Sequence, residues 1–195
     1  MKSAIAPTLL ACCLLLLALA AGPAAAERAD RSKPVDIEAD RMSVDDRNKV
    51  HVFEGSVVLT QGTLVIKGDK LVVTQGPDGF QKGVATVSGN KLATFRQKRD
   101  GSNEYIDGEA ERIEYDSRTE QARLFRRARV TSGGDEVRGN YIEYDSMSEN
   151  YFATNAPGAG SAPSAAPAAG GDARVRAVIQ PKGENKLETK PEASR

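Results

Sequence analysis

The chain has very few of the residues on which enzymes and metal proteins most often depend. It contains two cysteines, Cys12 and Cys13, and a single histidine, His51, among 195 residues. Both cysteines fall within the first 26 residues, which have the features of a signal peptide, so the mature chain would contain no thiol. A zinc site or a catalytic triad is difficult to build from one histidine without cysteine. The composition therefore predicts a protein that is not an enzyme and has no metal ion, cofactor or catalytic residue.

Aromatic residues are scarce and neither sign of charge is in excess. Tryptophan is absent, aromatic residues make up 5% of the chain, and 27 Lys and Arg balance 27 Asp and Glu. Proteins that bind nucleic acids need a strongly basic face for the phosphate backbone. Those that bind single strands also stack the bases on aromatic side chains. The sequence offers neither feature, so nucleic acid is not an expected partner.

Residues 1–26 have the layout of a secretory signal peptide. Lys2 supplies a positive charge, an apolar stretch follows, and three alanines end at Ala26, which gives a small-residue cleavage site before Glu27. We expect cleavage after Ala26 and export of the mature chain. A retained membrane anchor is the alternative, but the apolar stretch is short for a span. A second alternative is lipidation of Cys12, since Leu9–Cys12 resembles a lipoprotein processing box.

A short phrase, a turn-prone residue followed by apolar residues two apart, recurs along the chain. Copies begin at Ala39, Gly68, Ala110 and Gly139, and a weaker copy begins at Gly89. The spacing from the first copy to the third equals the spacing from the second to the fourth. Apolar residues at a spacing of two are typical of a strand with one buried face. The repetition indicates strands stacked around one long apolar core.

Residues 34–154 alternate between apolar and polar nearly throughout, with Gly- and Asp-rich turns between the runs and no sustained helical period. This pattern predicts one all-β domain: an antiparallel sandwich, a jelly roll or a solenoid. Residues 27–33 are expected to form a flexible lead.

Residues 155–195 are rich in Ala, Gly and Pro and then in charged side chains, a composition that predicts disorder. Only Val175, Val178 and Ile179 are expected to dock, and weakly. We therefore expect no strand in this tail, and truncation after Asn155 is expected to leave any assembly of the protein intact.

The order of the motifs resembles the LptA/OstA-like family of periplasmic lipopolysaccharide-transport proteins. The residues that carry the resemblance are Ile37–Asp40, Phe53–Gly62, Asp69–Leu71 and Ala93–Phe95, and in the second half Gly108–Glu111 and Gly139–Ile142. It implies a twisted, open β-jelly roll of antiparallel strands folded in a V. The interior would bind the acyl chains of lipopolysaccharide and carry it across the periplasm from the inner to the outer membrane. It also implies head-to-tail stacking of copies, and partners of the same fold at both membranes. The Ala/Gly/Pro-rich tail departs from the family pattern.

On this resemblance, the apolar face of the strands is the candidate lipid-binding surface. Its residues are Val35, Ile37, Met42, Val44, Val52, Leu59, Leu64, Ile66, Leu71, Val73, Phe95, Ile113, Tyr115, Leu124, Ile142 and Tyr144. Arg96, Arg123 and Arg127 are candidates for a rim that binds the phosphates of an amphiphile, because a guanidinium pairs with phosphate through two hydrogen bonds. Alternatively, these basic residues protect an edge strand from aggregation.

Three other functions remain open on the sequence. The chain could be a membrane-anchored inner-membrane relative of the same fold, an exported β scaffold that binds no lipid, or a periplasmic hydrolase. Retention of the leader would identify the first, and absence of lipid from the purified protein would identify the second. The sequence has no phosphate-binding loop, so transport would have to be driven by another protein.

Overall fold

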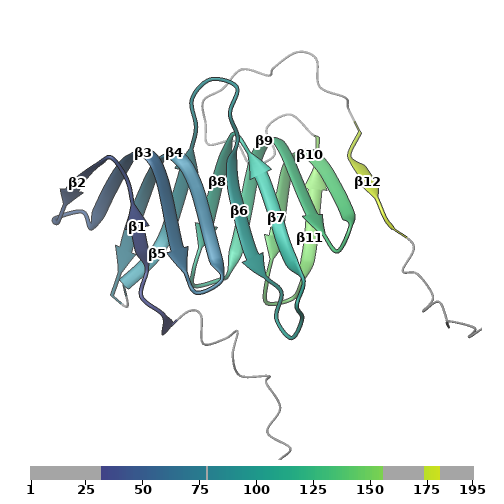
Figure 1. Cartoon of the computed structure of the whole chain (residues 1–195), viewed down its shortest axis with the longest axis horizontal. Coiled ribbons are helices and arrows are strands. Elements are labelled where there is room, and N and C mark those ends of the chain that lie inside the picture. The colour runs from purple at the N-terminus through teal and green to yellow at the C-terminus, as the bar shows by residue number, and fades with distance from the viewer. Residues whose placement is uncertain (1–31, 78, 156–173, 181–195) are drawn as a thin grey trace, which may run out of the picture.

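The computed structural model describes residues 32–77, 79–155 and 174–180, which form one twelve-stranded antiparallel sheet (Figure 1). The strands are β1 (Asp36–Glu38), β2 (Arg41–Asp45), β3 (Val50–Gln61), β4 (Leu64–Gly76), β5 (Gly79–Thr86), β6 (Ala93–Lys98), β7 (Tyr105–Ala110), β8 (Arg112–Asp116), β9 (Gln121–Ser132), β10 (Asp135–Asp145), β11 (Asn150–Thr154) and β12 (Arg176–Val178). None of the described residues forms a helix with the length and apolar character needed to cross a membrane. The prediction of an all-β jelly roll is confirmed.

The sheet folds over on itself because its four long strands each belong to two layers. The first part of β4, Val65–Lys67, pairs with β6, whereas its later part, from Lys70 onward, pairs with β5. β3, β9 and β10 divide in the same way. We call the layer that contains β1, β6, β7 and β12 the first layer, and the layer that contains β2, β5, β8 and β11 the second layer. The apolar core lies between them.

The long strands bend where they pass from one layer to the other. Gly55 and Ser56 on β3 have φ angles of 86° and 45°, and Arg126 and Arg127 on β9 have φ angles of 59° and 49°. The pairing registers shift in β3 and β9 at the same places. Such bulges bend a strand and increase its twist. The two bends are separated by the same spacing as the repeated phrases, so the repeat seen in the sequence is also a repeat of backbone conformation.

The repeat organises the sheet as a whole. β8 begins and ends one repeat length after β2, and β9 begins and ends one repeat length after β3. β1 falls within the segment that corresponds to β7, and β10 starts at the position that corresponds to the start of β4. The first repeat therefore runs β1–β2–β3–β4 and the second runs β7–β8–β9–β10, with β5 and β6 between them along the chain.

Substitution of Gly55 tests whether the bend in β3 leaves room for a side chain. A Cβ at residue 55 would lie 2.1 Å from Oδ2 and 2.7 Å from Cβ of Asp40. Gly55→Ala should lower the free energy of unfolding by about 2–4 kcal/mol, because positive-φ strain and this overlap act together. Gly89→Ala is the matched control, since Gly89 has a φ of +67° but no atom within 4 Å of the added Cβ. It should cost only about 1 kcal/mol in urea unfolding. Equal losses would mean that Asp40 moves aside freely.

One segment of the tail forms a strand, contrary to the expectation from composition. β12 pairs antiparallel with residues Glu136–Arg138 of β10, and the backbone N–H of Gln180 donates to Oδ1 of Asp135 at 2.7 Å. A short segment cannot form a strand alone, but an open sheet edge offers it backbone donors and acceptors. Residues 1–31, 156–173 and 181–195 lie outside the described part of the chain, as do the predictions of a signal peptide and of disorder there.

Candidate functional site

Most of the side chains that point between the two layers are apolar; the polar exceptions include His51, opposite Val73, and Gln97 and Ser132, opposite Ile106. The strand registers align the apolar side chains in rows that run from the N-terminal to the C-terminal end of the sheet. The row in the second layer is Met42, Phe53, Leu71, Ala85, Ile113, Leu124, Ile142 and Ala153. The row in the first layer is Ile37, Leu59, Ile66, Phe95, Gly108, Val130, Val137 and Ala177. No charged residue interrupts either row.

The structure brings most of the predicted apolar face together in this interior. The buried members are Leu59, Leu64, Ile66, Leu71, Val73, Phe95, Ile113, Tyr115, Leu124, Ile142 and Tyr144. Val35 and Ile37 are partly buried and pack against this cluster. Met42 and Val44 face the same side but remain 55% and 48% exposed, because β2 is the last strand of its layer.

Val52 does not belong to the interior, and its assignment to the inner face is wrong. The register pairs Val52 with Val72 and Phe53 with Leu71, so Phe53 points inward and Val52 outward. Both faces of the sheet are apolar here, since Val84 lies opposite Val72 on the outer side. Alternation alone could not choose between the two faces, because Val50 and Val52 are as hydrophobic as their neighbour Phe53.

Several interior residues were not predicted from the sequence. They are Phe53, Val57, Ala85, Ala93, Ile106, Ala110, Ala122, Ala128 and Val130. Most of them are alanines, which occur on either face of a sheet and give a weak signal. The small volume of an alanine leaves room for larger side chains of the opposite layer.

The middle of the interior is closed. The rings of Phe95 in the first layer and Tyr115 in the second lie 6.0 Å apart between centroids. A Cβ on Gly108 would lie 2.8 Å from Cδ2 of Leu124, so the layers meet closely there and only glycine fits without rearrangement. An acyl chain can therefore enter this region only if the layers move apart.

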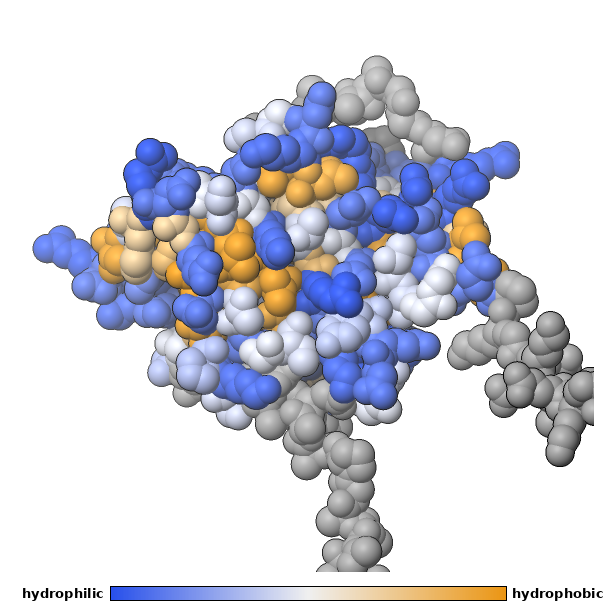
Figure 2. All heavy atoms as spheres, viewed as in Figure 1, coloured by the Kyte–Doolittle hydropathy of each residue, from blue (hydrophilic) through white to orange (hydrophobic). Residues whose placement is uncertain are grey.

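The interior reaches the surface at the two ends of the sheet. At the N-terminal end Met42 and Val44 are exposed, and at the C-terminal end Tyr151, opposite Tyr144 on the inner side, is 40% exposed. Figure 2 shows apolar side chains at the surface over the N-terminal strands, with a smaller group beside β12. Each end therefore presents apolar surface that a partner could cover.

An aromatic pair marks the C-terminal end of the interior. The rings of Tyr144 and Tyr151 are stacked with centroids 4.8 Å apart. Burial raises the pKa of Tyr151 to about 12 and raises that of Tyr144 as well. A tyrosine is uncharged at physiological pH even without this shift, so neither phenol adds a charge to this end of the interior.

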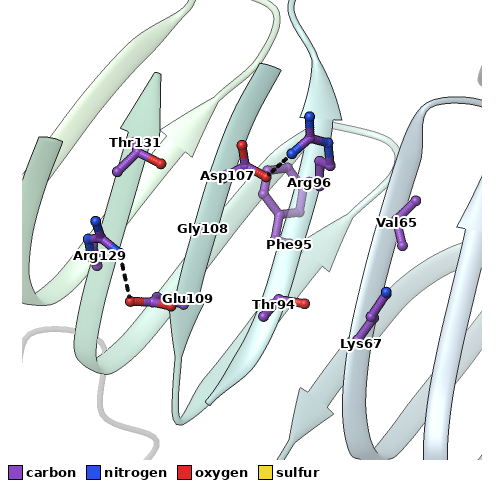
Figure 3. A pocket seen from close by; sticks show the side chains of 10 residues that line it. All are labelled: Val65, Lys67, Thr94, Phe95, Arg96, Asp107, Gly108, Glu109, Arg129 and Thr131. Atoms are coloured by element: carbon purple, nitrogen blue, oxygen red, sulfur yellow. Dashed lines mark hydrogen bonds and ion pairs between the residues drawn. The ribbon is translucent and has the colours of Figure 1, made fainter. Parts of the chain in front are cut away.

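A hollow of about 430 Å³ lies on the outer side of the first layer, away from the interior (Figure 3). Four of its charged side chains form ion pairs, Arg96 with Asp107 at 2.7 Å and Arg129 with Glu109 at 3.3 Å, and Lys67 also lines it. Arg129 also contacts Glu136. Hydrogen bonds from Arg138 and Arg129 hold the pKa of Glu136 at about 2. This hollow is therefore an ion-paired surface and offers no apolar ligand a continuous path.

The three arginines predicted to form a phosphate rim do not lie together. Arg96 points outward from the first layer, and Arg123 points outward from the second, where its Nε donates to Glu143 at 3.0 Å. Arg127 lies at the bend of β9, where its Nε donates to Glu111 at 2.9 Å. Each guanidinium already has a carboxylate partner. The structure therefore offers no single rim built from these residues.

Comparison with known proteins gives consistent results. The family described as LptA/(LptD N-terminal domain) LPS transport protein matches residues 36–150. The lipopolysaccharide export system protein LptA of Haemophilus influenzae is 31% identical over 68% of this chain and 76% of its own length. LptA of Escherichia coli is 33% identical over 63% of this chain and 65% of its own length. LptH of Pseudomonas aeruginosa is 30% identical over 86% of this chain and 91% of its own.

A solved structure extends the likeness from sequence to fold. The crystal structure of LptH, the LptA homologous periplasmic component of the conserved lipopolysaccharide transport device from Pseudomonas aeruginosa, superposes with a TM-score of 0.68. The match covers 78% of this chain and 99% of that one, at 26% identity. Within the described residues, no group of three His, Cys, Asp or Glu side chains is placed to hold a metal ion. On sequence and fold together, the chain belongs to the family of LptA and LptD N-terminal-domain lipopolysaccharide transport proteins.

Proposed function

We propose that this protein binds lipopolysaccharide by its acyl chains between the two layers and carries it across the periplasm from the inner to the outer membrane. The observation that carries the proposal is the pair of apolar rows, which run without a charged residue from one open end of the sheet to the other. A lipid tail could be passed along such a path without leaving an apolar environment. The proposal is supported by the family to which the chain belongs.

The closed middle of the interior sets the condition for binding. Phe95, Tyr115 and Leu124 pack across the two layers, and a bound acyl chain would replace these contacts with its own. Exchange of one apolar contact for another costs little, whereas exposure of the parted layers to water would cost about 25 cal/mol per Å². The layers should therefore part when lipid arrives and close when it leaves.

The same proposal includes the assembly and location of the protein. Cleavage after Ala26 would release a mature chain that starts at Glu27 and works in the periplasm. Copies would join head to tail, with partners of the same fold at the inner and outer membranes. The open strands at each end support this arrangement, because a strand edge can accept another strand by β-augmentation. Because such a contact joins two different surfaces of the protein, each pair of copies still has one free surface of each kind, and further copies can add to form a chain.

Photo-crosslinking tests the site of lipid binding. A photoreactive side chain at Ile37 or Phe95, which point inward, should label lipopolysaccharide. The same group at Glu38 or Thr94, the adjacent residues that point outward, should label it at least about tenfold less, since successive side chains of a strand face opposite sides. Equal labelling at all four positions would contradict an interior site. A purified protein that neither retains nor captures lipid would favour the exported scaffold.

A further inference from the structure

β12 occupies the same place in the second repeat that β6 occupies in the first. β6 pairs with residues Val65–Lys67 of β4, and β12 pairs with residues Glu136–Arg138 of β10, which are their equivalents one repeat later. Likewise, Lys70–Thr74 of β4 pair with β5, and Tyr141–Asp145 of β10 pair with β11. β11 and β12 are therefore the second repeat's equivalents of β5 and β6.

In the first repeat, β5 and β6 each accept a further strand on their other edge. β6 pairs with β7 and β5 pairs with β8. β7 and β8 are the second repeat's equivalents of β1 and β2. Among the described residues, β12 and β11 pair only with β10, and β1 and β2 pair only with β3. At the C-terminal end of the sheet, β11 and β12 therefore lack the further strand that β5 and β6 have. At the N-terminal end, β1 and β2 are strands of the kind that β5 and β6 accept (Figure 1).

We propose that residues 174–180 complete the C-terminal edge of the protein, and that a second copy adds its β1 to β12 and its β2 to β11 in the register of the internal repeat boundary. The inference rests on the proposed head-to-tail assembly and specifies its contact surface. Transfer of the β6–β7 register places Val178 opposite Asp36, Ala177 opposite Ile37 and Arg176 opposite Glu38 of the next copy. Transfer of the β5–β8 register places Ala153 opposite Met42, Phe152 opposite Ser43 and Tyr151 opposite Val44.

Two of the three residue pairs that this register forms between β12 and β1 are complementary. Arg176 meets Glu38, so opposite charges lie directly across the new pair of strands, an arrangement that stabilises a sheet. Ala177 leaves room for Ile37, much as Gly108 leaves room for Phe95 at the internal boundary. These features favour a second copy of this chain as the occupant of the edge.

The register also covers the apolar surface left at the two ends. Met42 and Val44, about half exposed in the single chain, would lie opposite Ala153 and Tyr151 and extend the interior rows. Tyr151 is 40% exposed and would be covered by the same strand. The apolar path would then continue from one copy into the next.

Truncation after Asn155 should therefore weaken assembly, contrary to the expectation from the sequence. Without residues 174–180, the first layer would end at β10, and the incoming β1 would have no strand in the position of β6. Since β12 lies at the edge of the sheet, its loss should leave the remaining fold in place.

Disulfide trapping tests the register, since the mature chain is expected to contain no cysteine. Glu38→Cys with Arg176→Cys, and separately Asp36→Cys with Val178→Cys, place the two thiols opposite each other. The crossed combinations, residue 38 with 178 and residue 36 with 176, displace the thiols by two positions, or about 6.6 Å along the strand. A disulfide requires Cα atoms within about 7 Å, so the matched pairs should form intermolecular cross-links at least about tenfold faster than the crossed pairs.

A deletion of residues 174–195 gives the complementary test by sedimentation. We expect it to weaken self-association at least about tenfold, with unfolding in urea still cooperative. Stronger association would show that β12 covers an edge that the next copy needs, and unchanged association would show that the segment takes no part. Either result, or cross-links that favour the crossed pairs, would overturn this inference while leaving head-to-tail assembly in place. Absence of any self-association of the full mature chain would overturn the head-to-tail proposal itself.

Discussion

Replacement of Phe95 by alanine should lower the free energy of unfolding by about 3–5 kcal/mol, the range expected for a buried aromatic side chain. Phe95 is only 1% exposed and is the largest of the fully buried side chains. It lies in the row of the first layer and packs across the interior against Tyr115. The cavity left by its side chain would lie where the two layers meet, beside Gly108, so neither layer could close it without a shift of the sheet. Urea unfolding of the mature chain measures the loss.

Thr94→Ala is the matched control for Phe95. Thr94 precedes Phe95 on β6, points to the outer side and is exposed. Its replacement should change the free energy of unfolding by less than about 0.5 kcal/mol, as is usual for surface positions. A loss below about 1 kcal/mol for Phe95→Ala would contradict a closed interior, because a cavity of this size in a well-packed core costs more. It would indicate instead that the layers are already apart in the free protein.

The double substitution Met42→Arg and Val44→Arg should weaken head-to-tail association about 100-fold or more. Both side chains face the interior from β2 and are exposed in the single chain, so the folded monomer should tolerate the change. In the assembly they would be covered by the next copy, and two arginines would lie there without a carboxylate partner. Removal of an unpaired charge from water costs several kcal/mol, and each loss of about 1.4 kcal/mol weakens affinity roughly tenfold. Sedimentation velocity over a concentration series measures the effect.

Ser43→Arg provides the control for this experiment. Ser43 lies between the two substituted residues on the same strand but points to the outer face, opposite Val52. An arginine there would remain in water in both the monomer and the assembly, so association should change by less than about threefold. If Ser43→Arg weakens association as much as the double substitution does, the effect comes from added charge at the edge. Undiminished association of the double variant would show that the N-terminal end of the interior is not covered.

The sequence by itself determined the class of fold, its repeat and most of its inner face. Alternation identifies strands because successive side chains point to opposite sides, a property of the backbone alone. For Ile37, Phe95 and Ile113 it also identified the inner side, because both neighbours of each residue along the strand are polar or charged. The spacing between equivalent phrases is likewise a property of the sequence, and the structure repeats it in strand boundaries and bends.

Only the tertiary structure decided the features that depend on which strand lies beside which. Val52 and Phe53 are both apolar, and it is the pairing of Phe53 with Leu71 that turns Phe53 inward. Met42 is exposed because no strand follows β2 in its layer, and the interior is closed because Gly108 admits Leu124 from the opposite layer. β12 forms because the edge of β10 supplies its hydrogen-bond partners. Each of these outcomes depends on contacts between residues far apart in the chain, which a local pattern of hydrophobicity does not encode.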